Sequence, residues 1–459
     1  MTEIDIRAPG ESREQLAKAL GDLVIPQLGA CYPETFGAVG DGVADDQRAL
    51  EAAAAEAAKT GRPIALKGGA TYAHSGVWEL DGVTVYGPTG AATLLATDAH
   101  STHPQHAIRL TGNGAKLVGV KVTTTWSGSR QDNPQSASVV IENATNFVVR
   151  GCSVSNSASV GIFTRLGSSR GSIQSNYVSD TRADGIHTVD GSRHILIAMN
   201  TVWDTGDDCI SVVSYLANGA PVEAVQISLN QVSGGMARGI AVVGGTNVAI
   251  NHNQVFSSRM TGIYVVSEDS FRTHGVDGAF VDQNLIVDCA RDDDWKALNA
   301  QGRAGHLIFR PRITNNVVRF TGTKGKAYFG AIIVWRDVVD ALVQGNQVVN
   351  SPGRGFTFNC RGLVASGNTV DGAALDGIHL DPDSAGIIRI SSNRLSACQS
   401  YGIASEPIRL GAEPDACNGL IIEGNDIAAL RNLGKAIDIH ASGERLHVRN
   451  NTLDGLELA

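Results

Sequence analysis

Residues 176–213 read NYVSDTRADGIHTVDGSRHILIAMNTVWDTGDDCISVV, and the pattern in this stretch predicts the fold of most of the chain. An Asn with an apolar residue two positions later is followed by a Gly-Ile or Cys-Ile pair, and the same order then begins again. The Asn recurs as Asn176, Asn200, Asn230, Asn253, Asn284, Asn316, Asn346, Asn368, Asn393, Asn425 and Asn451. Its intervals of 22 to 32 residues are typical of a solenoid whose turns differ in loop length.

The residues between these markers alternate and are often β-branched, as in Ile195–Ile197 and Val225–Ile227. Such segments predict short strands rather than helices. Neither helix-length apolar stripes nor a leucine framework accompanies the repeat, so helical and leucine-rich solenoids are excluded. We therefore expect an all-β, single-domain parallel β-helix with about three strands per turn and turns stacked at about 4.8 Å. The Asn side chains are expected to form a ladder in a turn of left-handed backbone geometry.

The N-terminal part is organised differently. An N-terminal extension over residues 1–30 is expected to contain a short helix at Ser12–Leu23. Residues 31–75 form a lead-in segment with an Ala-rich helix at about 46–59, for which Asp45 is the expected N-cap. Because a solenoid core is open at its end, this helix is expected to cap the β-helix of residues 76–459.

The lead-in segment carries a first resemblance. Residues 36–46 read FGAVGDGVADD, and after the Ala-rich helix a strand ends in Gly69-Ala70-Thr71-Tyr72. This order resembles the start of the pectin-lyase-like superfamily of right-handed β-helices, many of which degrade polysaccharides. The resemblance implies a right-handed coil, whereas the chemistry has to come from the site residues, because one fold hosts many functions.

Composition excludes several function classes. The 459 residues include 37 Lys and Arg against 46 Asp and Glu, a net charge of −9 that argues against a general nucleic-acid binder. No apolar run approaches the roughly 18 residues that span a bilayer. Residues 1–10 lack a basic start and an apolar stretch, and the seven Cys are scattered without paired spacing. We therefore expect no membrane partner, no secretory signal and a cytoplasmic, reducing location; a homo-oligomer is left open.

Candidate catalytic residues emerge when the turns are aligned on the Gly-Ile pair. The residue before the pair is Asp184, Asp208 and Arg238 in nearby turns, and the residue after it is His187 or Tyr264. Since the Ile is expected to point inward, its neighbours are expected to face outward and to stack on one side.

Asp207 precedes Asp208, and a bend at Gly206 would let both carboxylates face outward. Three neighbouring carboxylates repel one another and raise at least one pKa, which suits an acid and a base acting on a glycosidic bond. From the spacing alone, turn capping by Asp184 and Asp208 is an equally acceptable explanation.

The same region resembles the polygalacturonase family, glycoside hydrolase family 28. Its motifs Asn-Thr-Asp-Gly, Gly-Asp-Asp-Cys, Gly-His-Gly and Arg-Ile-Lys correspond here to residues 182–185, 206–209, 237–239 and 264–266. The resemblance implies hydrolysis with inversion, with Asp207 as general acid and with Asp184 and Asp208 activating the water. It implies neither a metal ion nor another cofactor.

The departures from that family concern substrate recognition. Arg238 replaces its His, Tyr264-Val265-Val266 replaces its Arg-Ile-Lys, and Arg182-Ala183 replaces its Asn-Thr. The two cations that hold a galacturonate carboxylate are therefore missing, and plain galacturonan is a poor candidate. Tyr264 is expected to stack on a neutral or differently substituted sugar. The residues predicted to contact substrate are His187, Arg238, Tyr264, Arg182 and Glu268.

Other features carry less weight. Glu268 is expected at the cleft rim or in a solvated turn, and Trp295 in a subsite lip or an ordinary exposed loop. The sequence Asp376-Gly377-Ile378-His379 repeats the pattern of Asp184 and His187 far along the chain, which indicates that the pattern can arise without a catalytic partner. No His/Cys spacing typical of a metal site and no phosphate-binding glycine loop is present.

Three hypotheses remain at this stage. The first is a glycoside hydrolase, or a related fructan or anhydride-forming transferase, acting on an oligo- or polysaccharide. The second is a polysaccharide lyase or epimerase; as a lyase it would hold Ca²⁺ on the carboxylates and use Arg238 as base, as in the β-helical pectate lyases that the fold resembles. The third is a non-catalytic glycan-binding or tailspike-like β-helix.

Overall fold

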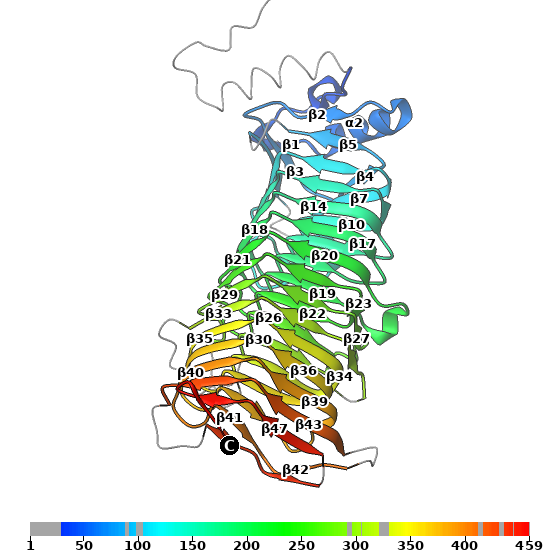
Figure 1. The fold of residues 1–459 in the computed structure, drawn as a ribbon. Helices are drawn as coiled ribbons and strands as arrows, with labels where there is room; N and C mark the ends of the chain where they lie inside the picture. The colour runs from blue at the N-terminus through cyan, green and yellow to red at the C-terminus, as the bar shows by residue number, and fades with distance from the viewer. Residues whose placement is uncertain are drawn as a thin grey trace, which may run out of the picture.

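The computed structural model describes residues 29–87, 91–97, 104–291, 296–303, 305–320, 330–411, 416–430, 436–443 and 445–458. Within these ranges the chain winds into a long parallel β-helix with one α-helix at its N-terminal end (Figure 1). The helix predicted at residues 12–23 and the loop around Trp295 lie outside the described residues.

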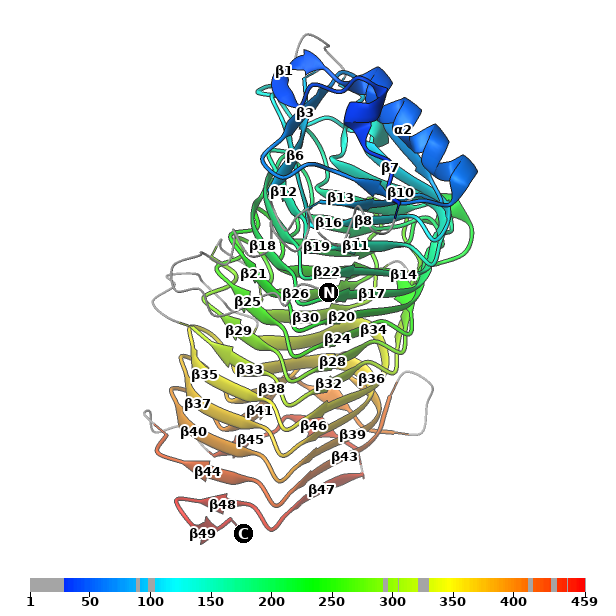
Figure 2. The ribbon, with the colours of Figure 1, turned by 90° about the horizontal axis from the view of Figure 1, so that it is seen from above.

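A typical turn of the coil contains three strands that pair in parallel with those of the next turn. One turn consists of β16 (Ile186–Thr188), β17 (Arg193–Ala198) and β18 (Thr201–Thr205). These pair with β19 (Ile210–Val213), β20 (Glu223–Ser228) and β21 (Gln231–Ser233). The stacked turns are seen along the whole molecule in Figure 2, so the prediction of about three strands per turn is confirmed.

The first strands of successive turns form one continuous column. They are β7 (Ile108–Asn113), β10 (Val139–Thr145), β13 (Ile162–Arg165), β16, β19, β22 (Ile240–Val243), β26 (Ile263–Val266), β30 (Leu298–Gln301), β34 (Ile332–Gln344), β36 (Phe356–Ser366), β38 (Ile378–Leu380) and β41 (Ile403–Ser405). The third strands likewise include β12 (Ser153–Ser155), β15 (Tyr177–Thr181), β18, β21, β25 (Gln254–Phe256), β29 (Leu285–Val287), β33 (Val317–Arg319), β35 (Gln347–Ser351), β37 (Thr369–Ala373) and β40 (Arg394–Cys398). The register within the first column fixes which outward side chains become neighbours.

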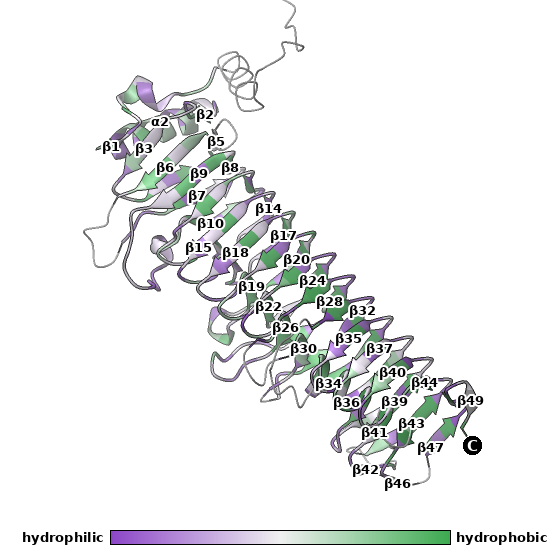
Figure 3. Cartoon of the chain, turned by 90° about the vertical axis from the view of Figure 1, so that its left-hand side faces the viewer, coloured by the Kyte–Doolittle hydropathy of each residue, from purple (hydrophilic) through white to green (hydrophobic). Residues whose placement is uncertain are grey.

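The core is the interior of the coil. The Ile of each Gly-Ile pair points inward, and Ile186, Ile210 and Ile240 are fully buried on top of one another. Their neighbours along the strand face the other way, as period-two alternation requires. Figure 3 shows this alternation as hydrophobic and hydrophilic segments along the strands.

The predicted Asn ladder and its left-handed turn are both confirmed. Asn253, like the other members before Asn451, donates from Nδ2 to a backbone carbonyl and to Oδ1 of the next Asn, at 2.9 and 3.0 Å. The left-handed residue is the one before the ladder Asn, with φ of 57° at Met199 and 58° at Leu229. Gly345 and Gly367 occupy this position in later turns. The Asn is therefore a hydrogen-bonding spacer inside the coil, and its predecessor makes the turn.

The helix α2 (Gln47–Thr60) covers the N-terminal end of the core (Figure 2). Leu50 is fully buried in the same apolar cluster as the strand residues, and the Trp78 indole donates to its carbonyl at 2.9 Å. The prediction of Asp45 as the N-cap holds in part, because the N-cap position belongs to Asp46, whereas the Asp45 carboxylate accepts the Gln47 amide at 3.1 Å.

All seven Cys are buried and unpaired, as expected for small apolar residues of the interior. Burial raises the pKa of the Cys152 and Cys289 thiols to about 11, which makes them poor nucleophiles. No helix among the described residues is long and apolar enough to cross a membrane.

Candidate active site

The structure brings the three predicted catalytic carboxylates together. Asp184 precedes β16, and the chain bends at Gly206 between β18 and β19, so that Asp207 and Asp208 both turn toward it. One oxygen from each carboxylate lies within 4.8 Å of the others. Residues 24 positions apart in sequence thus become neighbours because one turn of the coil separates them.

Asp184 is held as a carboxylate by three contacts. Its Oδ2 meets His187 Nδ1 and accepts the Ser211 hydroxyl at 2.7 Å, while Oδ1 accepts the backbone N–H of Asp208 at 3.0 Å. Although burial opposes ionisation, the electrostatic interaction with His187 and the hydrogen bonds from His187, Ser211 and Asp208 lower the pKa of Asp184. These contacts therefore favour the ionised form of Asp184.

The pKa of Asp208 shifts in the opposite direction, upward. Burial and then the charge of Asp184 raise its pKa well above the usual value, although Arg238 works against the rise. The Arg238 backbone N–H donates to Asp208 Oδ1 at 2.8 Å, and the guanidinium Nη1 lies 3.7 Å from that oxygen. The predicted rise of at least one pKa is therefore found at Asp208.

Asp207 is the most accessible of the three. Its side chain is 31% exposed, whereas those of Asp184 and Asp208 are 9% and 7% exposed. Its Oδ2 accepts a hydrogen bond from Arg130 Nη1 at 2.6 Å. Asp207 is thus the carboxylate that an external molecule can reach most directly, with Arg130 fixing its position.

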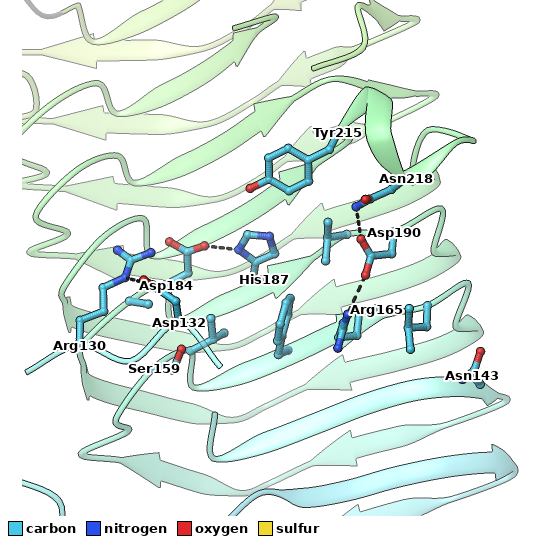
Figure 4. Close-up of a pocket in the computed structure, with 15 residues that line it drawn as sticks. Arg130, Asp132, Asn143, Ser159, Arg165, Asp184, His187, Asp190, Tyr215 and Asn218 are labelled. Atoms are coloured by element: carbon cyan, nitrogen blue, oxygen red, sulfur yellow. Dashed lines mark hydrogen bonds and ion pairs between the residues drawn. The ribbon is translucent and has the colours of Figure 1, made fainter. Parts of the chain in front are cut away.

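A cleft of about 780 Å³ opens beside this group on the outer face of β13 and β16. Figure 4 shows Arg130 and Asp184 at one end, His187 in the middle with Tyr215 above it, and Arg165, Asp190 and Asn218 toward the other end. Phe163 also lines the cleft, with its ring edge-on to His187. The cleft therefore combines polar groups of both signs with aromatic surface, as ligand sites usually do.

Both arginines of the cleft are paired with carboxylates. Arg165 contacts Glu142 at 2.9 Å and Asp190 at 3.2 Å, and Arg130 is bound to Asp207. The lining has two arginines and three aspartates, so it holds no surplus of positive charge for an anionic sugar.

Two predictions about substrate contact are wrong. Tyr264 does lie outside the core on the expected side, but it is only 2% exposed, and the Arg238 guanidinium covers its ring at 4.6 Å, so it offers no stacking face. Glu268 lies neither in a solvated turn nor at an open rim; it is 8% exposed and accepts from Arg238 at 2.9 Å. Outward orientation did not imply exposure, because the loop around Glu268 covers this part of the column.

The remaining predicted contact residues have different surroundings. His187 lines the cleft beside Asp184. Arg182 donates to the carbonyls of Gly128 at 2.6 Å and Trp126 at 3.1 Å. It therefore fastens the segment that carries Arg130. The repeated motif at Asp376 and His379 forms the same Asp–His hydrogen bond, at 2.9 Å, in a turn without the second and third carboxylates.

Sequence reasoning missed Arg130, Arg165, Asp190 and Tyr215. Phe163 had a usable signal, because it stands in the same aligned column as His187 and pairs with it in register. Arg130 had none, since it lies in a segment outside the repeat and reaches Asp207 across 77 positions of sequence.

The carboxylate group has the oxygen donors that Ca²⁺ prefers. Asp184, Asp207 and Asp208 would hold such an ion, but Arg130 and His187 already occupy oxygens of Asp207 and Asp184. A cation bound here would share these carboxylates with His187 and with the Arg130 guanidinium, whose positive charge opposes it, so the residues fit an acid–base group better than a metal site.

Comparison with known proteins agrees with the architecture. The family model described as "Right handed beta helix region" matches residues 106–277 and 296–453. A similar solved structure is PfbA, a surface adhesin of Streptococcus pneumoniae, with 16% identity and a TM-score of 0.60 over 82% of this chain and 91% of that one.

Two further solved structures resemble the chain. The N-terminal fragment of bacteriophage Phi29 gene product 12 has 15% identity and a TM-score of 0.58, over 97% of this chain and 75% of that one. The catalytic unit of a thermostable GH87 α-1,3-glucanase from Streptomyces thermodiastaticus strain HF3-3 has 16% identity and a TM-score of 0.54, over 91% and 70%. At these identities the likeness concerns the fold alone.

Proposed function

The chain belongs to the right-handed β-helix family, and on that premise we propose that it is a glycoside hydrolase acting at the cleft beside Asp184, Asp207 and Asp208. The observation that carries the proposal is the convergence of three carboxylates, with one oxygen of each within 4.8 Å of the others, beside a cleft of about 780 Å³. Their surroundings lower the pKa of Asp184 and raise that of Asp208. Paired acids and bases of glycosidases are separated in this way by their environments. The enzymatic activity of the GH87 neighbour on a glycan is consistent with this class.

The proposed roles follow from exposure and charge. The proton that Asp208 holds passes to Asp207, the most exposed carboxylate, which delivers it to the glycosidic oxygen as the bond between that oxygen and the sugar carbon breaks. Asp184, ionised and fixed by His187 and Ser211, takes a proton from the attacking water. Asp208 keeps a proton within the group and limits the repulsion between the other two.

Whether hydrolysis inverts or retains the configuration of the anomeric carbon is a separate question. The carboxylate oxygens lie within 4.8 Å of one another, below the roughly 6.5–9.5 Å that separates the carboxyl groups of typical inverting pairs. The expectation of inversion therefore rests on the polygalacturonase resemblance alone, and the anomeric configuration of the first product decides it.

The substrate class we propose is a neutral glycan. Arg130 and Arg165 each form an ion pair with a carboxylate, and Arg238 forms one with Glu268. Among the described residues of the cleft, no two unpaired arginines are therefore placed to bind the carboxylate of a uronate. Phe163 and Tyr215 supply aromatic surface for a sugar ring.

The test is turnover on tetrasaccharides and polymers of α-1,3-glucan, β-1,4-glucan, β-1,4-xylan and α-1,4-galacturonan, followed by product NMR. Asp207→Asn should lower turnover by at least about 100-fold, as expected on losing a general acid, with an unchanged circular dichroism spectrum. Asp204→Asn, an exposed change in β18 three residues before Asp207, is the matched control. Unchanged turnover in Asp207→Asn refutes the role given to Asp207, and activity confined to galacturonan refutes the substrate class.

The lyase hypothesis receives less support. Burial opposes the charge on Arg238, but Asp208, Tyr264 and Glu268 more than compensate and raise its pKa, so this arginine is a poorer base than usual. A lyase would produce unsaturated products that absorb in the near ultraviolet and would lose activity with a chelator. Either result would replace the hydrolase proposal.

A further inference from the structure

A second pocket lies far along the same column of strands as the candidate active site. His187 pairs in register with the next turn, and the register continues through Ser211, Ala241, Tyr264, Asn299, Ile333 and Thr357 to His379. These seven steps correspond to about 34 Å at the spacing of parallel strands. Both histidines therefore belong to one side of the coil.

The second pocket, of about 460 Å³, resembles the first in its chemistry. Arg354, Asp376, His379, Tyr401 and Ser405 line it, the same residue types that the first cleft offers as Arg130, Asp184, His187, Tyr215 and Ser159. Arginine and carboxylate groups beside an aromatic ring suit the hydroxyls and apolar faces of a sugar.

Two buried atoms in this pocket have no hydrogen-bond partner. His379 is 4% exposed, and its Nδ1 contacts Asp376 at 2.9 Å, whereas its Nε2 has no hydrogen bond and Glu406 lies 3.9 Å away. Arg354 Nε, 3.4 Å from Asp376, also lacks one. Buried polar atoms are almost always satisfied, so groups of this kind inside a pocket point to a polar ligand.

We propose that this pocket is a second, non-catalytic glycan-binding site, which anchors a polymer whose other part occupies the catalytic cleft. This proposal rests on the proposed function for the ligand class. The pocket lacks hydrolytic machinery, because the positions that correspond to Asp207 and Asp208 are Ser400 and Tyr401. Two linked sites bind a long chain more tightly than either site alone.

The test counts binding events by calorimetry in the Asp207→Asn background, with the same tetrasaccharides as probes. Two events per chain are expected there, and one after the further changes Tyr401→Ala and Glu406→Ala. Tyr401 is partly exposed and the Glu406 side chain is 52% exposed, so neither change opens the core. Arg409→Ala, an exposed change on the neighbouring β42 (Ile408–Arg409), should leave two events.

For a polymer, the Tyr401→Ala/Glu406→Ala variant should raise the dissociation constant at least about tenfold, while tetrasaccharide turnover in the otherwise native protein stays within about twofold. A single event in Asp207→Asn, or two events unaffected by the pocket changes, overturns the proposal. Binding of CaCl₂ or ZnCl₂ that the pocket changes abolish, without sugar binding, also overturns it. Retained turnover in Asp207→Asn refutes only the role given to Asp207, whereas two binding events without turnover in the wild type refute the proposed hydrolase and leave the second site standing.

Discussion

Asp208 has an unusual position, since a carboxyl group stands almost fully buried beside an ionised carboxylate. Its raised pKa means that the folded chain holds a proton which the unfolded chain has lost above about pH 4. The stability linked to this proton is complete below the unfolded pKa and is lost as the pH rises through the folded pKa. Asn has the same shape as Asp but no charge, so replacing Asp208 by Asn should avoid this loss of stability at high pH.

We therefore predict that Asp208→Asn melts above the wild type at pH 8, by at least about 2 °C, and that the difference shrinks toward pH 4. The Asn keeps an oxygen that can accept the Arg238 amide. Differential scanning calorimetry across this pH range is the measurement, with the exposed Asp204→Asn as control. A variant that melts at or below the wild type at pH 8 contradicts the assignment.

Asp184 should show the opposite dependence, because its pKa is lowered in the folded state. Its contribution to stability is present above the unfolded pKa and disappears as the pH falls through the folded one. Asp184→Asn is expected to melt below the wild type at pH 7, and the deficit should narrow on acidification. A deficit that stays constant with pH would mean that lost packing, not lost charge, causes it.

Arg182 illustrates a residue that acts through another. It fastens the carbonyls of Trp126 and Gly128, and this segment carries Arg130 to Asp207. Arg182→Met should increase hydrogen exchange at residues 126–131 and lower kcat about tenfold, since small misplacements near reacting groups are costly. Arg150→Met, at an exposed position of the coil, is the control. Unchanged exchange in this segment would contradict the role.

At the scale of elements, the turn before each third strand combines two devices. The ladder Asn satisfies backbone groups inside the coil, while the residue before it adopts the left-handed conformation. Asn253→Ala should destabilise the protein by about 3 kcal/mol, because it leaves the Asn230 amide and the Ile227 carbonyl buried without this partner. Asn251→Ala, two positions away and partly exposed, should change little. Urea unfolding compares them, and equal losses would contradict the argument.

The left-handed position can be tested separately at Gly367, where φ is +62° and an added Cβ would meet no atom closer than 4.0 Å. Gly367→Ala therefore isolates backbone strain from steric overlap. A loss of about 1–2 kcal/mol in urea unfolding is expected. Gly411→Ala, where φ lies outside the left-handed region and the nearest atom is 3.5 Å away, is the control.

At the scale of the whole molecule, the sequence repeat correctly predicted which side chains of successive turns become neighbours. The Gly-Ile alignment located Asp184, Asp207 and Asp208 correctly, because register in a solenoid converts sequence period into lateral contact. It failed at Tyr264 and Glu268, because covering loops do not follow the repeat. The sequence did not predict the contact of Arg130 with Asp207, because the segment that carries Arg130 does not follow the repeat. Periodicity thus predicts which residues meet, whereas exposure depends on the irregular insertions.

We predict that the capping helix α2 keeps the N-terminal end of the coil from associating with other chains. An uncovered end of a β-helix presents apolar side chains and unpaired strand edges to other chains. Leu50 of α2 is fully buried against the first turns, whereas Ala55 on the same helix is exposed. Leu50→Asp should displace the helix and produce larger species in size-exclusion chromatography with light scattering, while Ala55→Asp, which adds the same charge, should elute as the wild type does. Identical elution of both variants would mean that the end of the coil is closed by something other than α2.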